Sequence, residues 1–519
     1  MSKRTWNYRR ASVVLFFIAT TVRLFHQYPV VHIINDEATY LATARDFPLH
    51  RLYNREVYLM HGPGYPALVR LGMILLPDYL AGIAASLAMW GVAFWALGWL
   101  GRLAGLDRTG VLLARGFLAF LPMHIDVSQS ILKEATMVAL YTLLLAGFLE
   151  SHHGRRRGYW VSAIAGGYLA FTADQHVPLV LLSLAAIWIC GSRRAAAWVC
   201  VVPMLLVWAG WVCFRRIYFA AAGPLVPVGI DGLPEVAGRL GWLNAIVQPS
   251  APETMSVLAH WKFLTSLRGA KDFLVGFFLP LNMVPRFYPI LFWWYRLLAL
   301  SIPFGMAAGF WRVRSPRRRW RTLGLVLAAL IMVGIPMLRG LFPRYSLLAA
   351  VPLACTAGRS SSWLPRGRRR RALWVVIGPA ALLVAAGMFY ARSSRFLVFA
   401  CDRAVETEVV SRWLDTHATA GILAQIGYPP ELAYQTDRRV LAMPVRPEML
   451  DEAIRAFNIS HIVVSTAHKE FWGSAKSIDY LLQHPERFRP VADLPEPALP
   501  GRPENRFLVL EVLPDRSSL

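Results

Sequence analysis

The chain is poor in charged residues, in acids and in cysteines. Only 17% of its 519 residues are charged, whereas a soluble domain carries about 25%. Asp and Glu number 31 against 55 Lys and Arg, and there are five cysteines. So few cysteines exclude a disulfide scaffold. So little charge beside 56% hydrophobic residues excludes an ordinary soluble protein and indicates a membrane protein.

Two motifs are also missing. The polar C-terminal region has no glycine-rich phosphate loop, so we predict no nucleotide site there. We find no internal repeat, which many transporters contain.

The net charge of +24 would suggest a nucleic-acid partner in a soluble protein. In a membrane protein the same excess marks the cytoplasmic loops, so we predict no nucleic acid.

Long apolar runs dominate what is present. Eleven runs, from 11–30 to 372–391, suit transmembrane helices, which need about 20 residues each. The stretch 271–288 is a weaker twelfth. The apolar segment 63–77 is short, is bounded by prolines and carries Arg70, which favours a helix lying at the membrane interface over a full span. We therefore predict a polytopic α-helical membrane protein with about 11–13 transmembrane helices.

The basic residues predict which side each loop occupies. If the N-terminus is cytoplasmic and 63–77 does not span, six segments with 22 basic residues and one acid all fall inside. These segments are 1–10, 101–109, 152–158, 191–194, 312–321 and 366–371. This topology suits a bacterial inner membrane. It leaves two loops, about 31–78 and 214–288, and the region 392–519 on the outer, periplasmic side.

The region 392–519 has a different, polar composition. Helical patterns alternate in it with strand-like runs, which predicts a small α/β domain outside the membrane, following a transmembrane domain over 1–391. The predicted helices are 402–416, 447–457 and 476–484, and the predicted strands are 421–426, 439–443, 461–465 and 506–512.

The first candidate site follows the first span directly. Asp36 and Glu37 are adjacent carboxylates where an interfacial helix would begin, and Tyr40 follows one turn later. One interpretation is a helix cap with an acid favoured by the helix dipole. The other is a general base at the membrane surface, able to take a proton from an acceptor hydroxyl. Two carboxylates could also bind a divalent cation, although two oxygen ligands alone are weak evidence for a metal.

Other polar residues lie on the same predicted side. His61 precedes a Gly- and Pro-rich turn and is either a phosphate ligand or a loop histidine. Lys133 and Glu134 open the span 131–150, as a site or as an interface anchor. Asp174 lies between two spans and is either a site residue or a turn former, of which the turn former is favoured.

Two arginines run against the charge distribution. Arg339 and Arg344 lie in an outer link, where basic residues are scarce, and this favours a phosphate ligand over an anchor. A guanidinium fork suits a phosphodiester oxygen. All the candidates fall on one predicted side, which fits an enzyme that takes an anionic, lipid-linked donor.

The order of these motifs resembles that of the GT-C-type integral-membrane glycosyltransferases. The similarity is greatest to the protein O-mannosyltransferases and the lipid A aminoarabinose transferases, and it covers nearly the whole chain. The matching motifs, in order, are Asp36-Glu37 with Tyr40, Pro63-x-Tyr65-Pro66, Glu134 at the start of a span, Pro343-Arg344-Tyr345 and an outer α/β domain. Each motif is short, and their order and common side carry the resemblance.

The resemblance implies a role for each matching residue. Asp36 would be the catalytic carboxylate with Glu37 beside it, Glu134 a second acid, and Arg344 and Tyr345 contacts of the lipid phosphate. Relatives often carry Lys where this chain has His61-Gly62, and a basic residue near Asp174. His61, Lys133 or Arg339 would therefore replace the missing phosphate ligands.

The implied donor is a polyprenyl-phosphate sugar, and the acceptor is a glycan, a lipid or a protein. We expect no metal ligand set and no certain cofactor. Two alternatives stay open from the residues alone. A transporter or flippase for an anionic lipid would show ionised residues at mid-membrane and a repeat, and a non-catalytic membrane subunit would leave Asp36-Glu37 unexplained.

Overall fold

The computed structural model forms two compact units, which are described separately. It describes residues 3–24, 36–45, 62–190, 195–222, 300–312, 315–338, 343–363, 401–425, 429–436, 438, 440–443, 447–465, 475–495 and 506–514. Unit 1 contains the described parts of 1–27, 82–211 and 246–393, and unit 2 those of 28–81, 212–245 and 394–519.

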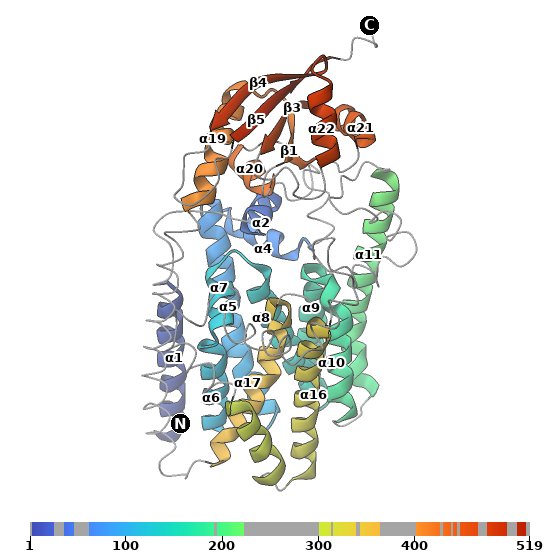
Figure 1. Ribbon diagram of the computed structural model, residues 1–519. Helices are drawn as coiled ribbons and strands as arrows, with labels where there is room; N and C mark the ends of the chain where they lie inside the picture. The colour runs from blue at the N-terminus through green and yellow to red at the C-terminus, as the bar shows by residue number, and fades with distance from the viewer. Residues whose placement is uncertain are drawn as a thin grey trace. The chain divides into compact units, whose positions relative to one another are not determined.

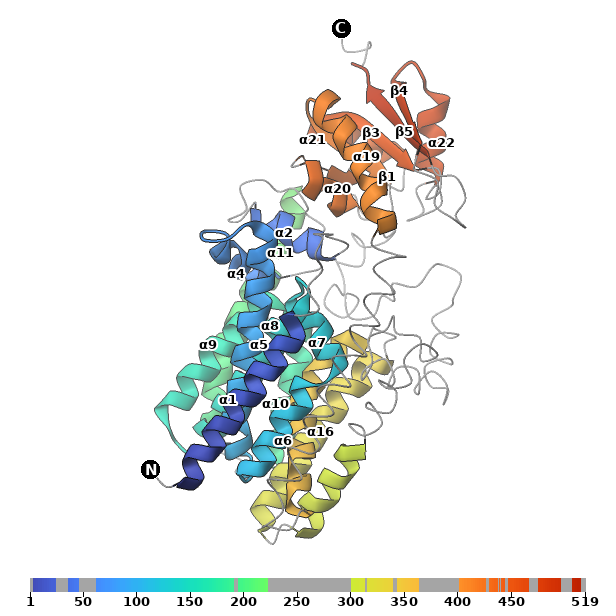
Figure 2. The same ribbon diagram turned by 90° about the vertical axis from the view of Figure 1, so that its left-hand side faces the viewer.

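Unit 1 is a bundle of helices that run side by side along a common direction (Figure 1, Figure 2). Its α-helices are α1 (Lys3–Leu24), α5 (Asp78–Leu103, all but its first turn), α6 (Arg108–Ala119), α7 (Pro122–Gln129), α8 (Lys133–Ser151), α9 (Arg156–Thr172), α10 (Val177–Ile189), the first half of α11 (Val202–Ala222), α16 (Pro316–Leu338) and α17 (Ala350–Gly358). Shorter turns are η1 (Asp174–His176), η2 (Ala195–Val201), η5 (Ala308–Arg312), η6 (Pro343–Ala349) and η7 (Arg359–Trp363).

Several helices of unit 1 have the length and composition of membrane spans. Among the described residues three qualify alone, at Asp78–Leu103, Lys133–Ser151 and Arg319–Pro336. Two bent pairs, α6 with α7 and α9 with α10, raise the number to five if each pair is one span. The total of 11–13 spans stays a prediction, because the runs 271–288 and 372–391 lie outside the described residues.

Prolines explain where the bent pairs break. α6 and α7 meet at 66°, and α7 begins at Pro122. α9 and α10 meet at 115°, and α10 has a proline in its first turn. Proline lacks the N–H that would continue a preceding helix, but it fits the first turn of a new one. The run 110–126, predicted as one span, is therefore two helices at an angle.

α8 and α9 approach closely through two glycines. A Cβ on Gly147 would lie 2.8 Å from the Gly158 carbonyl oxygen, and a Cβ on Gly158 would lie 2.5 Å from the Ser151 nitrogen. Small residues let helix backbones come together in this way. At the turn between the two helices, Glu150 is buried and its carboxylate accepts hydrogen bonds from Arg155 and Arg157 at 3.3 and 3.2 Å.

Unit 2 contains a five-stranded mixed sheet in the order β2-β1-β3-β5-β4. β1 is parallel to β2 and β3, whereas β5 is antiparallel to β3 and β4. The strands are β1 (Gly421–Gln425), β2 (Val440–Ala442), β3 (Ile459–Ser465), β4 (Phe488–Pro495) and β5 (Arg506–Val512). The helices around them are α19 (Cys401–His417), α20 (Pro429–Thr436), α21 (Glu448–Phe457) and α22 (Ala475–Gln483).

Alternating side chains give this sheet an apolar core on both faces. Ile462 and Leu510 pack with α21 and α22, while Val463 and Val509 pack with α19 and α20. Adjacent residues of a strand point to opposite faces, so both faces need apolar side chains when both are covered. Figure 1 shows α19 on one side of the sheet and α22 with α21 on the other.

The sequence ranges predicted for this region overlap β1, β2, β3, β5, α19, α21 and α22. β4 and α20 were missed. β4 contains Pro490 and Pro495, which argue against a strand. It is an edge strand, where proline is tolerated. The position of this domain outside the membrane stays a prediction.

Two short helices of the region 31–78, predicted as the first outer loop, also belong to unit 2. α2 (Asp36–Arg45) and α4 (Gly64–Gly72) pack against each other, and α2 also packs against α20. α4 has nine residues, about 14 Å of helix, which is too short to cross a hydrocarbon core of about 30 Å. Its location at the membrane interface stays a prediction.

Candidate active site

Asp36 is the first residue of α2. Its side chain lies outside the described part of the structure, so its contacts remain a prediction. Glu37, the next residue, is partly buried. A carboxylate at the first turn of a helix is stabilised by the positive end of the helix dipole. The backbone therefore places both acids in the first turn of α2, and their role stays a prediction.

Aromatic packing fixes the helix that carries these acids. Tyr40 on α2 and Tyr65 on α4 are both fully buried, and their rings meet edge to face at 5.1 Å between centroids. This geometry is favourable for aromatic pairs. The Pro63-x-Tyr65-Pro66 motif thus forms the start of α4 and holds α2 in place.

Arg45 anchors the other end of α2 at two points. It pairs with Asp78 at the start of α5, and its Nη1 donates to the Tyr434 carbonyl oxygen of α20 at 2.9 Å. Its guanidinium also lies 4.1 Å from the centre of the Tyr434 ring. Burial raises the pKa of Tyr434, Asp78 raises it further, and Arg45 lowers it. Arg45 was not among the residues that sequence reasoning selected, since its partners are distant in the chain.

In unit 1, Lys133 and Glu134 are the first two residues of α8 and are buried, at 1% and 2% exposure. An interface anchor would keep its ammonium group in contact with solvent. The burial of Lys133 is therefore unlike that of an anchor. Ionisable residues buried in this way in a membrane helix are costly and are commonly functional.

The segment that carries Arg344 and Tyr345 packs against the same helix. Both belong to η6, which packs against α7 and α8. Their side chains lie outside the described part. The neighbouring Ser346 is fully buried, and its hydroxyl has no hydrogen-bond partner among the described residues. The fold thus brings the Pro343-Arg344-Tyr345 segment to the helix that begins with Lys133 and Glu134.

A buried arginine that the sequence analysis missed lies next to this region. Arg23, near the end of α1, is 0% exposed and bonds to α7. Its Nε donates to Ser128 Oγ at 2.7 Å, Nη1 donates to the Ala19 and Ala119 carbonyl oxygens at 2.9 and 3.1 Å, and Nη2 lies 3.1 Å from His124 Nδ1. The guanidinium also lies 3.7 Å from the centre of the Trp90 ring.

This network defines the state of His124. Arginine is only a donor, so Nδ1 must accept and the ring is neutral with its proton on Nε2. His124 Nε2 is buried and has no hydrogen-bond partner in the described chain. A single arginine inside the apolar run 11–30 was the signal that could have identified this cluster.

The remaining candidates divide into described and undescribed residues. Asp174 is in η1 with His176, and both are buried, at 4% and 3% exposure. η1 links α9 to α10, which agrees with a turn at Asp174. His61 and Arg339 lie outside the described residues. Among the residues that are described, no group of three or more His, Cys, Asp or Glu side chains could hold a metal ion.

The candidate residues are distributed over both units. Unit 2 holds the acids at the start of α2, and unit 1 holds Lys133, Glu134, Arg23 and the η6 segment. A carboxylate can act as a general base, and buried cations can stabilise an anionic leaving group.

Known structures with the same fold were found along the whole chain. ArnT from Cupriavidus metallidurans bound to undecaprenyl phosphate matches with a TM-score of 0.60 and 14% identity, over 98% of each chain. The arabinofuranosyltransferase AftD from Mycobacteria matches with a TM-score of 0.56 and 16% identity, over 99% of this chain and 40% of AftD. The oligosaccharyltransferase of Archaeoglobus fulgidus matches with a TM-score of 0.54 and 12% identity, over 97% of this chain and 74% of the oligosaccharyltransferase.

No model of a known protein family matches the sequence, and a search of curated proteins by sequence gives no match. At 12–16% identity the structural matches establish the fold. All three proteins are GT-C glycosyltransferases, so the GT-C fold expected from the sequence motifs is confirmed. The apolar helices and this fold together identify an integral membrane protein.

Proposed function

We propose that this chain, which has the GT-C fold, transfers a sugar from a polyprenyl-phosphate donor to an acceptor on the outer face of the membrane. The observation that carries the proposal is the match with ArnT, which extends over 98% of both chains and was solved with undecaprenyl phosphate bound to ArnT. The buried Lys133 and Glu134 support it, since a purely structural bundle gains little from burying ionisable groups.

Asp36 acts as the general base in this proposal. It orients an acceptor hydroxyl and takes its proton as the oxygen attacks the anomeric carbon. The new bond forms between that oxygen and the anomeric carbon, while the bond from the anomeric carbon to the phosphate oxygen breaks. One base and one displacement invert the configuration at that carbon. The transferred sugar is a hexose or a pentose.

Cationic groups stabilise the leaving polyprenyl phosphate. We assign this role to Arg344, with Tyr345 as a further contact and Lys133, His61 or Arg339 as additional ligands. Preorganised positive charge is effective where water is excluded, because the interaction is stronger at low dielectric. Glu134 is a second acid that orients Lys133 or the acceptor.

The proposal is tested with Asp36→Asn in the full chain, purified and incubated with a panel of labelled polyprenyl-phosphate sugars. We expect transfer to fall by about 100-fold or more, as general-base catalysis contributes 10²–10⁴. The matched control is Asp415→Asn, which removes an exposed acid from α19 and should leave transfer unchanged.

Two results would contradict the proposal. Full activity of the Asp36→Asn protein would remove Asp36 from the mechanism. Movement of labelled lipid across the membrane by the wild type, with no sugar released, would favour a flippase, and neither activity would favour a non-catalytic subunit.

A further inference from the structure

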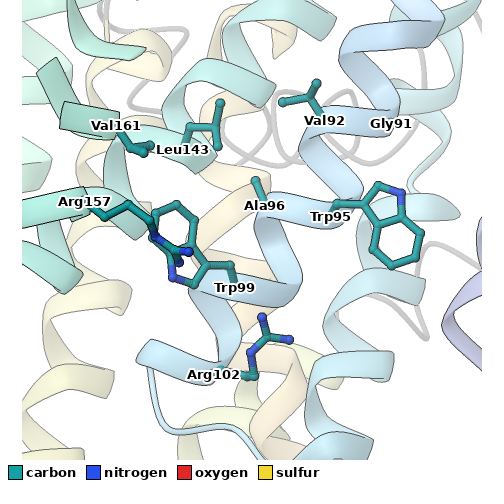
Figure 3. A pocket seen from close by; sticks show the side chains of 9 residues that line it. All are labelled: Gly91, Val92, Trp95, Ala96, Trp99, Arg102, Leu143, Arg157 and Val161. Atoms are coloured by element: carbon teal, nitrogen blue, oxygen red, sulfur yellow. The ribbon is translucent and has the colours of Figure 1, made fainter. Parts of the chain in front are cut away.

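A groove on the surface of unit 1 has the features of a phospholipid site. It has a volume of about 680 Å³ and lies between α5, α8 and α9. Small or branched side chains form its apolar part, namely those of Val92, Ala96 and Val161. Two arginines complete it, Arg102 from the last turn of α5 and Arg157 from the first turn of α9 (Figure 3).

The length of the groove suits an acyl chain. It follows α5 from Gly91 to Arg102, which is about 16 Å of helix. Trp95 and Trp99 lie along the same stretch, one turn apart, and tryptophan is enriched where a membrane meets water. Figure 3 shows Arg102 at one end of this stretch, with Val92 and Gly91 at the other. The groove is thus apolar along most of its length and cationic at one end.

Arg157 is held in place but keeps free donors. Its guanidinium lies 4.6 Å from the centre of the Trp99 ring, and its Nε donates to Glu150 at 3.2 Å. Because Glu150 also accepts from Arg155, two arginines share one acid. The side chain of Arg157 is 67% exposed, and its terminal nitrogens form no hydrogen bond with Glu150 among the described contacts, so they are available to a ligand.

Arg102 has no such neutralising partner. Its side chain is exposed and forms no hydrogen bond or ion pair within the described part of the chain. The start of α9 adds two further basic residues, Arg155 and Arg156. An anion with an apolar tail therefore complements the groove, since a guanidinium binds phosphate oxygens well.

We propose that the groove binds an anionic glycerophospholipid, with one acyl chain along α5 and the phosphate between Arg102 and Arg157. On the predicted topology these arginines lie at the cytoplasmic side, so the bound lipid comes from the inner leaflet. This site is separate from the donor site proposed above and does not depend on the transfer reaction.

The proposal is tested by native mass spectrometry of the full chain, purified and stripped of lipid. The probes are phosphatidylglycerol and phosphatidylcholine with identical acyl chains. We expect wild type to retain phosphatidylglycerol preferentially, and the Arg102→Gln/Arg157→Gln protein to retain about fivefold less of it. The control Arg155→Gln/Arg156→Gln removes the same charge from residues that do not line the groove. It should stay within about twofold of wild type.

A third variant tests the apolar part. Val161→Phe fills the groove while both arginines remain, and we expect it to reduce retention of phosphatidylglycerol. Equal retention of the two lipids by wild type, equal losses in both double variants, or unchanged retention in Val161→Phe would each overturn the proposal. None of these readouts requires transferase activity, so failure of this site and failure of the proposed function are distinguishable.

Discussion

Arg23 is the most completely enclosed cation that the structure describes in the helix bundle. Its guanidinium bonds at once to a serine, a histidine and two backbone carbonyls in α1, α6 and α7. The planar guanidinium of arginine carries five N–H donors on three nitrogens and can do this. The ammonium group of lysine has a single nitrogen at the end of a flexible chain and cannot reach all these acceptors at once. The residue therefore joins three helices through geometry that only arginine provides.

We expect Arg23→Lys to destabilise the protein by about 3 kcal/mol, because buried acceptors lose their donors while the charge stays buried. Thermal unfolding of the detergent-solubilised protein measures the effect. Arg9→Lys, at an exposed position on the same helix, is the control. Equal unfolding temperatures for Arg23→Lys and wild type would show that the network contributes nothing.

His461 gives the C-terminal sheet a dependence on pH. Its ring is 7% exposed on β3 and meets Trp413 edge to face at 5.6 Å. Burial lowers the pKa of His461 below 6.5, His417 and Arg438 lower it further, and Glu511 opposes them. The unfolded chain then binds a proton that the folded chain does not. Stability therefore falls as the pH drops below 6.5, until it reaches the lowered folded-state pKa.

We expect the unfolding temperature of unit 2 to drop between pH 7.5 and 5.5, and to drop less in His461→Gln, which has no imidazole to protonate. Differential scanning calorimetry of the full chain at each pH measures how the unfolding temperature of each protein changes with pH. Parallel slopes in the two proteins would exclude His461 as the source.

The close contact between α8 and α9 requires residues without side chains. Gly147 and Gly158 allow α8 and α9 to meet backbone to backbone. We expect Gly158→Ala to cost about 1–3 kcal/mol despite the better helix propensity of alanine, because its Cβ would press on backbone atoms that cannot move aside. Gly210→Ala, where a Cβ meets open space, is the control in the same unfolding assay. A Gly158→Ala protein as stable as this control would contradict the close contact.

The position of α2 depends on Arg45. We expect Arg45→Ala to speed hydrogen exchange in α2 and α20, because the bond to the Tyr434 carbonyl and the pair with Asp78 are lost together. Hydrogen exchange followed by mass spectrometry gives this for each segment. Arg70→Ala, on the exposed side of α4, should change neither helix. Unchanged exchange in the Arg45→Ala protein would mean that α2 is held by the tyrosine pair alone.

Sequence patterns predicted elements better than they predicted partners. Strands such as β3 and β5 were visible because their apolar residues run continuously or alternate. β4 was hidden by prolines that an edge strand accepts. The motif residues Lys133 and Glu134 were selected, but Arg23, His124 and Arg45 were not, because their partners lie far away in the chain. Periodicity reports which residues are buried; it carries no information on which distant residues they meet.

For the molecule as a whole, the arginine distribution predicts topology. We expect alkaline phosphatase fused after Leu519 to be active in a bacterial host and the same reporter fused after Gly154 to be inactive, because that enzyme needs an oxidising compartment. A cytoplasmic reporter at the same two points should give the opposite pattern. An inactive phosphatase at the C-terminus would contradict the prediction that the C-terminal region lies on the outer side of the membrane.

The α8–α9 pair also bears on how the chain is built into its membrane. Its contacts, its glycine crossing and the Glu150 ion pairs are all local in sequence, so they can form while later helices are still on the ribosome. A hairpin that closes early buries Glu150 already paired with arginine, and burial of an ionised group is far less costly in that state. The turn between the two helices would then act first during biogenesis, as the point where the charge of a nascent hairpin is neutralised before the rest of the bundle assembles around it.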